Sequence, residues 1–261
     1  MGRFDGQVVW ITGGGTGIGK ACACEFAREG ATVVVSGRRL DRLTACVEEL
    51  KALGAEALAV PCDVTDEAAM AQATEQVVAA FGGIDVVLAN AGYGVTGTIA
   101  DLPDDAWRRQ FEVNVFGLLN TVRVTLPYVV ERKGRFGLLG SVAAFIALPK
   151  SGAYCASKAA VRSIAENLAL ELKGTGATSS AIHPGFVESE IAQVDNEGVH
   201  KPERQDRRPA KLMWTAEDAA RVIVRGMHRR QREVVVTGHA KVAIALGRWF
   251  PSLVAWAVGR G

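Results

Sequence analysis

The sequence predicts an α/β fold, with a doubly wound parallel sheet of seven strands and helices on both faces of the sheet. Two observations predict it. Short apolar runs rich in β-branched residues alternate along the chain with amphipathic stretches of helical length, as repeated strand–helix units require. The first run, at 7–11, leads directly into a glycine-rich turn at 12–19, and a helical pattern follows that turn.

The predicted elements follow one another without an internal repeat or a linker. Strands are expected in the apolar runs at 8–11, 32–36, 57–60, 86–89, 136–139, 178–182 and 233–237. Helices are expected in the amphipathic stretches at 18–29, 40–53, 66–81, 104–131, 153–172 and 216–230. We therefore expect a single domain over 1–238 and an apolar C-terminal tail over 239–261 that is not a separate domain.

Composition narrows the classes of function. Of the 261 residues, 49% are hydrophobic and 22% charged, which suits one α/β domain with a large core. The formal charge of +2 argues against a dedicated nucleic-acid binder.

The cysteine count of five is odd and the N-terminus has no apolar signal region, so we expect reduced thiols and a cytoplasmic protein. The histidines lack metal-ligand spacing, which predicts no metal site, and His183 is expected to satisfy local hydrogen bonds at a strand end.

The turn at 12–19 has the residues that a dinucleotide-binding site requires. Gly13 permits a tight turn, Gly17 lets the backbone approach a phosphate, and Gly19 allows the helix to lie close to the strand. Backbone amides at the start of the helix, around Ile18, can then hold a pyrophosphate. A glycine motif alone is a weak signal, but here the strand before it and the helix after it are those of a Rossmann-like fold.

Tyr154 and Lys158 stand four residues apart in a predicted helix, so their side chains project into the same space. An isolated tyrosine titrates near pH ~10 and exchanges protons poorly at neutrality. A lysine charge ~4 Å from the phenolate is worth about 4 kcal/mol at an effective dielectric of about 20. That interaction would lower the tyrosine pKa by up to roughly three units and make an acid/base group for a carbonyl or alcohol oxygen. Taken alone, however, the pair is more simply explained as a solvated helix face.

Further polar and small residues stand in the turns after the predicted strands, where open parallel sheets bind ligands. In chain order they are Asp63 and Val64, then Asn90, Ala91 and Gly92, then Asn114, Ser141, Tyr154 with Lys158, and Pro184, Gly185 and Val187. Together with the glycine turn, this ordered set resembles the short-chain dehydrogenase/reductase family over about residues 4–238. Ser141 lies thirteen residues before Tyr154, which is the usual spacing in that family.

The resemblance implies hydride exchange between a nicotinamide cofactor and a carbonyl or alcohol carbon. It implies that Tyr154 is the general acid or base and that Ser141 hydrogen-bonds the substrate oxygen. Lys158 would lower the tyrosine pKa and bind the nicotinamide ribose, and Asn114 would position a water that links this lysine to solvent. The physical chemistry agrees, because an acidified phenol beside a hydroxyl donor stabilises negative charge as it develops on oxygen.

The resemblance also implies the cofactor contacts. Asp63 would accept a hydrogen bond from the adenine amino group, and Ser189 keeps a hydroxyl where the family usually has Thr. The other implied contacts come from the glycine turn, the strand ends and the catalytic helix: Gly13, Thr16, Gly17, Ile18, Val64, Asn90, Ala91, Gly92, Tyr154, Lys158, Pro184, Gly185 and Val187.

Cofactor choice depends on the end of the second predicted strand. An acidic residue at Gly37 would bind the ribose hydroxyls of NAD, and none is present. Arg38 and Arg39 can instead make charge-assisted hydrogen bonds to the 2′-phosphate of NADP. The second position at which the family places a basic residue for NADP is occupied here by Thr16. NADP (NADPH) is therefore favoured over NAD by one of the two basic positions only. A solvated arginine pair that begins a helix is the alternative.

Two classes of function follow from these expectations. The first is an NADP(H)-dependent oxidoreductase that interconverts a secondary alcohol and a ketone; the alternative is a non-catalytic NADP(H)-sensing binding protein on the same fold. The catalytic set favours the enzyme, because a sensor needs no acid/base pair. The loop at 143–149 and the segment at 186–213 are expected to form the pocket walls, the second as a mobile lid.

The expected partners are a small carbonyl or alcohol substrate and, by the habit of the family, further copies of the chain in a homodimer or homotetramer. The tail is apolar over 241–258 but too short and interrupted to span a bilayer comfortably. Docking on its own domain or a subunit interface is favoured for it, with peripheral membrane contact as the alternative.

Overall fold

The computed structural model describes residues 2–206 and 208–258, and its sheet has the predicted doubly wound topology. Seven parallel strands lie in the order β3-β2-β1-β4-β5-β6-β7. They are β1 (Val8–Thr12), β2 (Thr32–Gly37), β3 (Ala57–Pro61), β4 (Val86–Ala89), β5 (Arg135–Leu139), β6 (Thr178–His183) and β7 (Glu233–Val235). The predicted fold class is confirmed, and the last strand is shorter than expected.

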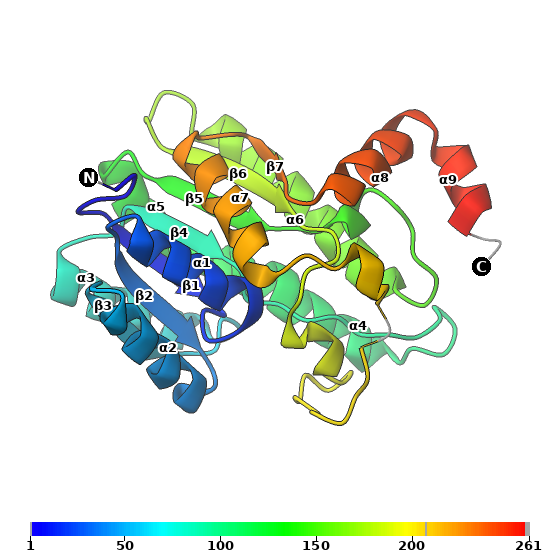
Figure 1. Cartoon of the computed structure of the whole chain (residues 1–261), viewed down its shortest axis with the longest axis horizontal. Helices are drawn as coiled ribbons and strands as arrows, with labels where there is room; N and C mark the ends of the chain where they lie inside the picture. The colour runs from blue at the N-terminus through cyan, green and yellow to red at the C-terminus, as the bar shows by residue number, and fades with distance from the viewer. Residues whose placement is uncertain (1, 207, 259–261) are drawn as a thin grey trace.

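Helices cover both faces of the sheet (Figure 1). One face carries α1 (Gly17–Arg28), α2 (Leu40–Ala52) and α7 (Ala216–His228), and the other carries α3 (Glu67–Phe81), α5 (Gly117–Glu131) and α6 (Gly152–Glu171). Side chains alternate between these faces along a strand. In β1, Val9 and Ile11 pack in the first core, whereas Val8 and Trp10 pack in the second. This is why the central strands read as continuous apolar runs.

The helix predicted at 104–131 is interrupted. It consists of α4 (Asp104–Phe111), a π-helical segment η1 (Glu112–Phe116) and α5. A π-helical turn inserts an extra residue and often marks a functional site; here it buries Asn114 and Val115. By length and composition the span Asp104–Glu131 could cross a membrane, but half of its most apolar window is buried inside the domain, as expected for a core helix.

The C-terminal tail folds into two helices, α8 (Gly238–Trp249) and α9 (Pro251–Val258). α8 packs through Ala240 and Ile244 against Val142, which lies in the short 3-10 helix η2 (Val142–Ala144) after β5. α9 lies beyond it, at one end of the molecule (Figure 1). Val242, Leu246 and Trp249 on α8 are exposed, so one side of α8 is docked on the domain and the other side is an apolar surface.

His183, the last residue of β6, corrects one expectation. The side chain is fully buried, and neither ring nitrogen has a hydrogen-bond partner in the described part of the chain. The ring packs edge-on against Phe145, with centroids 4.8 Å apart, and Glu233 Oε1 is 3.6 Å from Nε2. Burial lowers the pKa of His183 to about 4, so the ring is neutral at pH 7. The expected local hydrogen bonds are absent in the described structure, because Phe145 packs against the ring and the Glu233 carboxylate lies just beyond hydrogen-bond distance.

Candidate active site

Two cavities lie at the carboxyl ends of the strands, where the strand order reverses between β1 and β4. The first, of about 260 Å³, is lined by the glycine turn and by the ends of β2 and β4. The second, of about 1000 Å³, is lined by Ser141, Tyr154 and largely apolar side chains. Ile191 borders both cavities, so they adjoin. We call them the cofactor cleft and the substrate cavity.

The glycine turn forms a cradle that side chains would fill. Gly13 has φ +64°, and a Cβ there would lie 2.9 Å from the Cα of Ala91. Gly17 has φ +52°, and a Cβ would lie 3.0 Å from that of Ser189. Asn90 ties the turn to β4, because its Nδ2 donates to the carbonyls of Thr12 (2.9 Å) and Gly13 (3.0 Å). The amides at the start of α1 thus face open space, which fits the pyrophosphate of a dinucleotide.

Most of the predicted cofactor residues come together in the cofactor cleft. Those that line it are Gly13, Thr16, Gly17, Ile18, Arg38, Arg39, Asp63, Val64, Asn90, Ala91, Gly92 and Ser189. Gly185 lines the substrate cavity with Ser141 and Tyr154. Four predicted residues are buried behind the cavity walls: Asn114, Lys158, Pro184 and Val187.

Asn114 and Lys158 lie just under the wall between the two cavities. A Cβ on Gly92 would be 2.9 Å from Asn114 Oδ1 and 3.6 Å from Lys158 Nζ. Asn114 Oδ1 accepts from the Tyr93 N–H (3.1 Å), and its Nδ2 donates to the Tyr93 carbonyl (3.0 Å). Lys158 Nζ donates to the carbonyl of Leu139 at 2.8 Å. The amide and the ammonium are therefore fixed by backbone groups.

The Tyr154 hydroxyl shares the substrate cavity with Ser141, which follows the end of β5. Burial raises the pKa of Tyr154, and the hydrogen bond from Ser141 partly offsets this effect. The net direction is thus opposite to the lowering that Lys158 was expected to cause, and the role of Lys158 toward Tyr154 stays a prediction. The Lys158 ammonium lies 5.8 Å from the centre of the Tyr154 ring, and burial lowers its own pKa to about 8. Desolvation is the largest cause of both shifts, since burial disfavours the charged form of each group.

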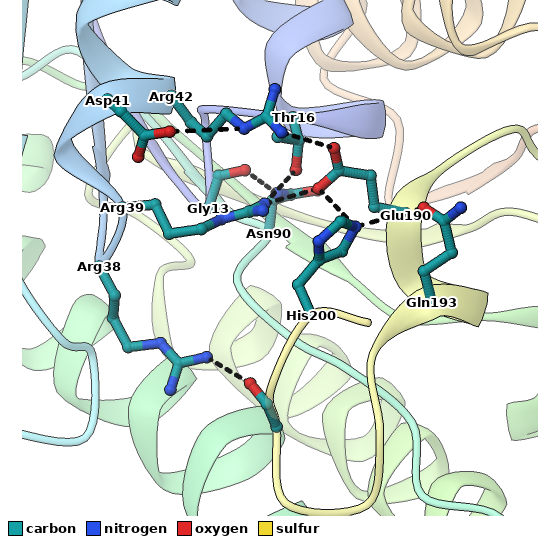
Figure 2. A network of polar contacts seen from close by, with 11 residues as sticks. Gly13, Thr16, Arg38, Arg39, Asp41, Arg42, Asn90, Glu190, Gln193 and His200 are labelled. Carbon is teal, nitrogen blue, oxygen red and sulfur yellow. Dashed lines mark hydrogen bonds and ion pairs between the residues drawn. The ribbon is translucent and has the colours of Figure 1, made fainter. Parts of the chain in front are cut away.

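The two arginines after β2 reach the cofactor cleft, but both have protein partners (Figure 2). Arg38 Nη2 donates to the carbonyl of Gly198 at 3.0 Å. Arg39 Nη2 lies 2.7 Å from Glu190 Oε2 and 3.4 Å from Thr16 Oγ1. Sequence reasoning missed Glu190, because no local pattern signals a contact between residues 151 positions apart.

Arg208, from the segment expected to form a pocket wall, and His239, which the sequence did not predict as a site residue, are further members of the site. Both line the substrate cavity. Arg208 Nη1 donates to the carbonyl of Val187 (2.9 Å), which fixes the segment that precedes Ser189. His239, at the start of α8, accepts from the Phe186 N–H through Nε2 (2.9 Å). The first turn of the C-terminal tail is therefore part of the substrate cavity. The stretch 201–208, expected in the lid, includes Arg207, which lies outside the described residues.

Known proteins are similar to this chain in sequence and in architecture. The family model described as short chain dehydrogenase matches residues 7–200. A short chain dehydrogenase from Pseudocercospora fijiensis is 38% identical over 199 residues, which cover 75% of this chain and 64% of that protein. An uncharacterized oxidoreductase from Myxococcus xanthus is 32% identical over 97% of this chain and 96% of its own length.

A solved structure extends the likeness to the whole chain. The crystal structure of a short chain dehydrogenase/reductase from Burkholderia phymatum, in complex with NAD, matches with a TM-score of 0.87 and 28% identity, over 97% of this chain and 96% of that one. The family binds nicotinamide cofactors and acts on small molecules, in agreement with the cradle and the cavity described above. The glycine turn, the ordered strand-end residues and these matches together show that the chain is an oxidoreductase of the short-chain dehydrogenase/reductase family.

Proposed function

We propose that the protein is an NADP(H)-dependent oxidoreductase that interconverts a secondary alcohol and a ketone. One observation carries this proposal: the hydroxyls of Ser141 and Tyr154 share one cavity, directly beside the cleft formed by the glycine turn. The bound nicotinamide supplies the hydride chemistry. Ser141 holds the substrate oxygen, and Tyr154 donates a proton to it or takes one from it.

The protonation states favour carbonyl reduction near neutral pH. Because burial raises the pKa of Tyr154, the phenol keeps its proton and can donate it to a developing alkoxide. Lys158 is held by the Leu139 carbonyl, which lines the cofactor cleft, so its ammonium is placed to interact with a cofactor ribose. In the reverse direction the phenol must first lose its proton, so alcohol oxidation is expected to increase at alkaline pH.

Arg38 and Arg39 support NADP(H) over NAD(H). Both line the cofactor cleft, and the position of Gly37 itself carries no carboxylate that would bind the ribose hydroxyls of NAD(H). A guanidinium can hold a phosphate with two charge-assisted hydrogen bonds. The related protein from Burkholderia phymatum was solved with NAD, so NAD is the alternative that the assay below includes.

The substrate cavity supports a bulky, mainly apolar ketone, of the size of a lipid, a steroid or an acyl chain. A volume of about 1000 Å³ exceeds what a small alcohol needs. Ile146, Leu148, Phe186 and Ala243 supply apolar surface, whereas the carboxylate and guanidinium groups come from the 203–208 stretch. A long apolar chain that projects from the carbonyl therefore matches the cavity.

We also propose a cytoplasmic homodimer or homotetramer. Phe116, beside α5, and Leu170, on α6, are about half exposed although both are large and apolar, which supports subunit contacts on these two helices. The exposed side of α8 is a further candidate contact surface, and peripheral membrane contact is the alternative for it. Light scattering during size-exclusion chromatography measures the mass; a monomeric mass at micromolar concentration would contradict the oligomer.

The direct test is NADPH and NADH oxidation with a panel of ketones, aldehydes and 3-oxoacyl thioesters. Tyr154→Phe should reduce turnover by at least about a hundredfold, since it removes the proton donor. Tyr128→Phe, on α5 outside both cavities, is the matched control and should keep the wild-type rate. Turnover untouched by Tyr154→Phe would refute the mechanism, and NADPH binding without turnover of any panel member would favour a sensing protein.

A further inference from the structure

Glu190 lies in the cofactor cleft among basic side chains. Its carboxylate extends from the 3-10 helix η3 (Glu190–Gln193) toward the end of β2 (Figure 2). Three basic side chains surround it: Arg39 at 2.7 Å, His200 at 3.7 Å and Arg42 at 4.0 Å. Burial raises the pKa of Glu190, but the hydrogen bond from Arg39 and the nearby positive charges outweigh burial and lower it, so the group is ionised at neutral pH.

The basic groups around Glu190 form an anion site that is shared with the glycine turn. The same Arg39 nitrogen that binds Glu190 lies 3.4 Å from the Thr16 hydroxyl, just before the first residue of α1. A carboxylate and a phosphate compete for the same face of a guanidinium, because both accept its parallel N–H groups. Glu190 Oε2 therefore occupies, through Arg39 Nη2, one of the positions that a phosphate oxygen would take.

We propose that Glu190 is a coenzyme-selectivity residue: its carboxylate is an internal substitute for the 2′-phosphate, which NADP(H) must displace from Arg39 and NAD(H) need not. The inference rests on the proposed use of Arg39 in phosphate binding. The displacement involves no bond making or breaking. It lowers the affinity for NADP(H) by the free energy of the Arg39–Glu190 ion pair and by repulsion between the two anions.

The segment that carries Glu190 also contacts the second arginine. Arg38 donates to the carbonyl of Gly198, and Asn196 makes two hydrogen bonds to the backbone of Thr96, at 2.9 and 3.0 Å. Residues 190–200 therefore lie across the adenosine end of the cofactor cleft and are held by both arginines. Ile191 of the same segment borders the substrate cavity, so a 2′-phosphate that displaces Glu190 also acts on a wall of that cavity.

Isothermal titration of Glu190→Gln with NADP⁺ and NAD⁺ tests the proposal without any substrate. NADP⁺ should bind the variant at least about fivefold more tightly than it binds the wild type, as expected for the loss of a partly exposed ion pair. Affinity for NAD⁺ should stay within about twofold. Glu188→Gln is the matched control: it removes the same charge two residues away, from an exposed side chain with no ion pair in the described part of the chain, and should behave like the wild type.

The outcomes separate the inference from the proposed function. An unchanged or weaker affinity for NADP⁺ in Glu190→Gln would overturn the role of Glu190, whichever coenzyme the wild type prefers. A selective loss of NAD⁺ affinity would also overturn it, because Glu190 would then be binding the ribose hydroxyls. The wild-type preference between NADP⁺ and NAD⁺ tests the proposed cofactor independently, and melting temperatures verify that each variant is folded.

Discussion

Lowering the pH from 7 to 5 should destabilise the protein through His183, which is buried without a hydrogen-bond partner in the described structure. Burial comes first among the causes that lower its pKa from 6.5 to about 4, and Arg162 and Arg248 add to it, while the Ser141 backbone and then Glu166 oppose it. The unfolded chain therefore binds a proton more readily than the folded one. Stability must decrease as the pH falls through the window from 6.5 to about 4.

The size of the effect follows from the two pKa values. At pH 5 the unfolded histidine is almost fully protonated and the folded one is about nine-tenths neutral, which costs about 2 kcal/mol relative to pH 7. Below pH 4 the loss levels off at about 3 kcal/mol. Well above pH 6.5 the group contributes almost nothing, because the histidine is then neutral in both states.

Urea denaturation at pH 7 and pH 5, followed by circular dichroism, measures the difference. His183→Phe keeps a planar ring against Phe145 and should lose about 2 kcal/mol less than the wild type over this interval. His183→Leu gives a second apolar replacement should the larger ring fit poorly. His228→Phe replaces an exposed histidine on α7 and should behave like the wild type. Equal pH dependence in the wild type and both His183 variants would refute the reasoning.

Three further substitutions test the site and the core. Gly185→Ala places a Cβ 2.2 Å from His239 Nε2, so it should cost about 1–3 kcal/mol and weaken NADPH binding; an unchanged fluorescence titration would contradict this. Ser36→Ala removes the hydroxyl that accepts a hydrogen bond from the buried Trp10 indole N–H at 3.0 Å in the wild type. The free energy of unfolding in urea should fall by about 1–3 kcal/mol. A change smaller than the measurement error would contradict this prediction. Asn114→Ala should reduce kcat by about a hundredfold or more with little change in NADPH affinity, and a wild-type kcat would remove Asn114 from the proton path.

The regular parts of the fold could be predicted because their causes are local. The central strands are buried on both faces, so they appear in the sequence as short β-branched runs, and the glycine turn follows the first of them. The helix predicted at 104–131 differs from the structure only where the backbone hydrogen bonds change from the α-helical to the π-helical spacing. The π-helical turn at Asn114 leaves no sequence signature, because the apolar pattern continues through it.

The sequence predicted most of the residues that make up the site, but not the partners of its charged groups or the direction of their pKa shifts. The residues in the strand-end turns converge because parallel strands end at one edge of the sheet. The partners of the charged groups come from remote segments. Arg39 binds a carboxylate far along the chain, and Lys158 donates to Leu139, across the interface between α6 and β5. Desolvation also reversed the expected direction of the Tyr154 pKa, and burial of this kind cannot be read from residue spacing.

The position of α8 brings the C-terminal tail to the substrate cavity and not to the cofactor cleft. The residues that line the cofactor cleft all lie at or before His200, whereas His239 and Ala243 bring α8 into the wall of the substrate cavity. Substitution of Ala243 can therefore reshape one part of the substrate-cavity wall without altering a residue that lines the cofactor cleft. His239 is less suited to such variation, because its Nε2 accepts from the Phe186 N–H and so holds the segment that precedes Val187.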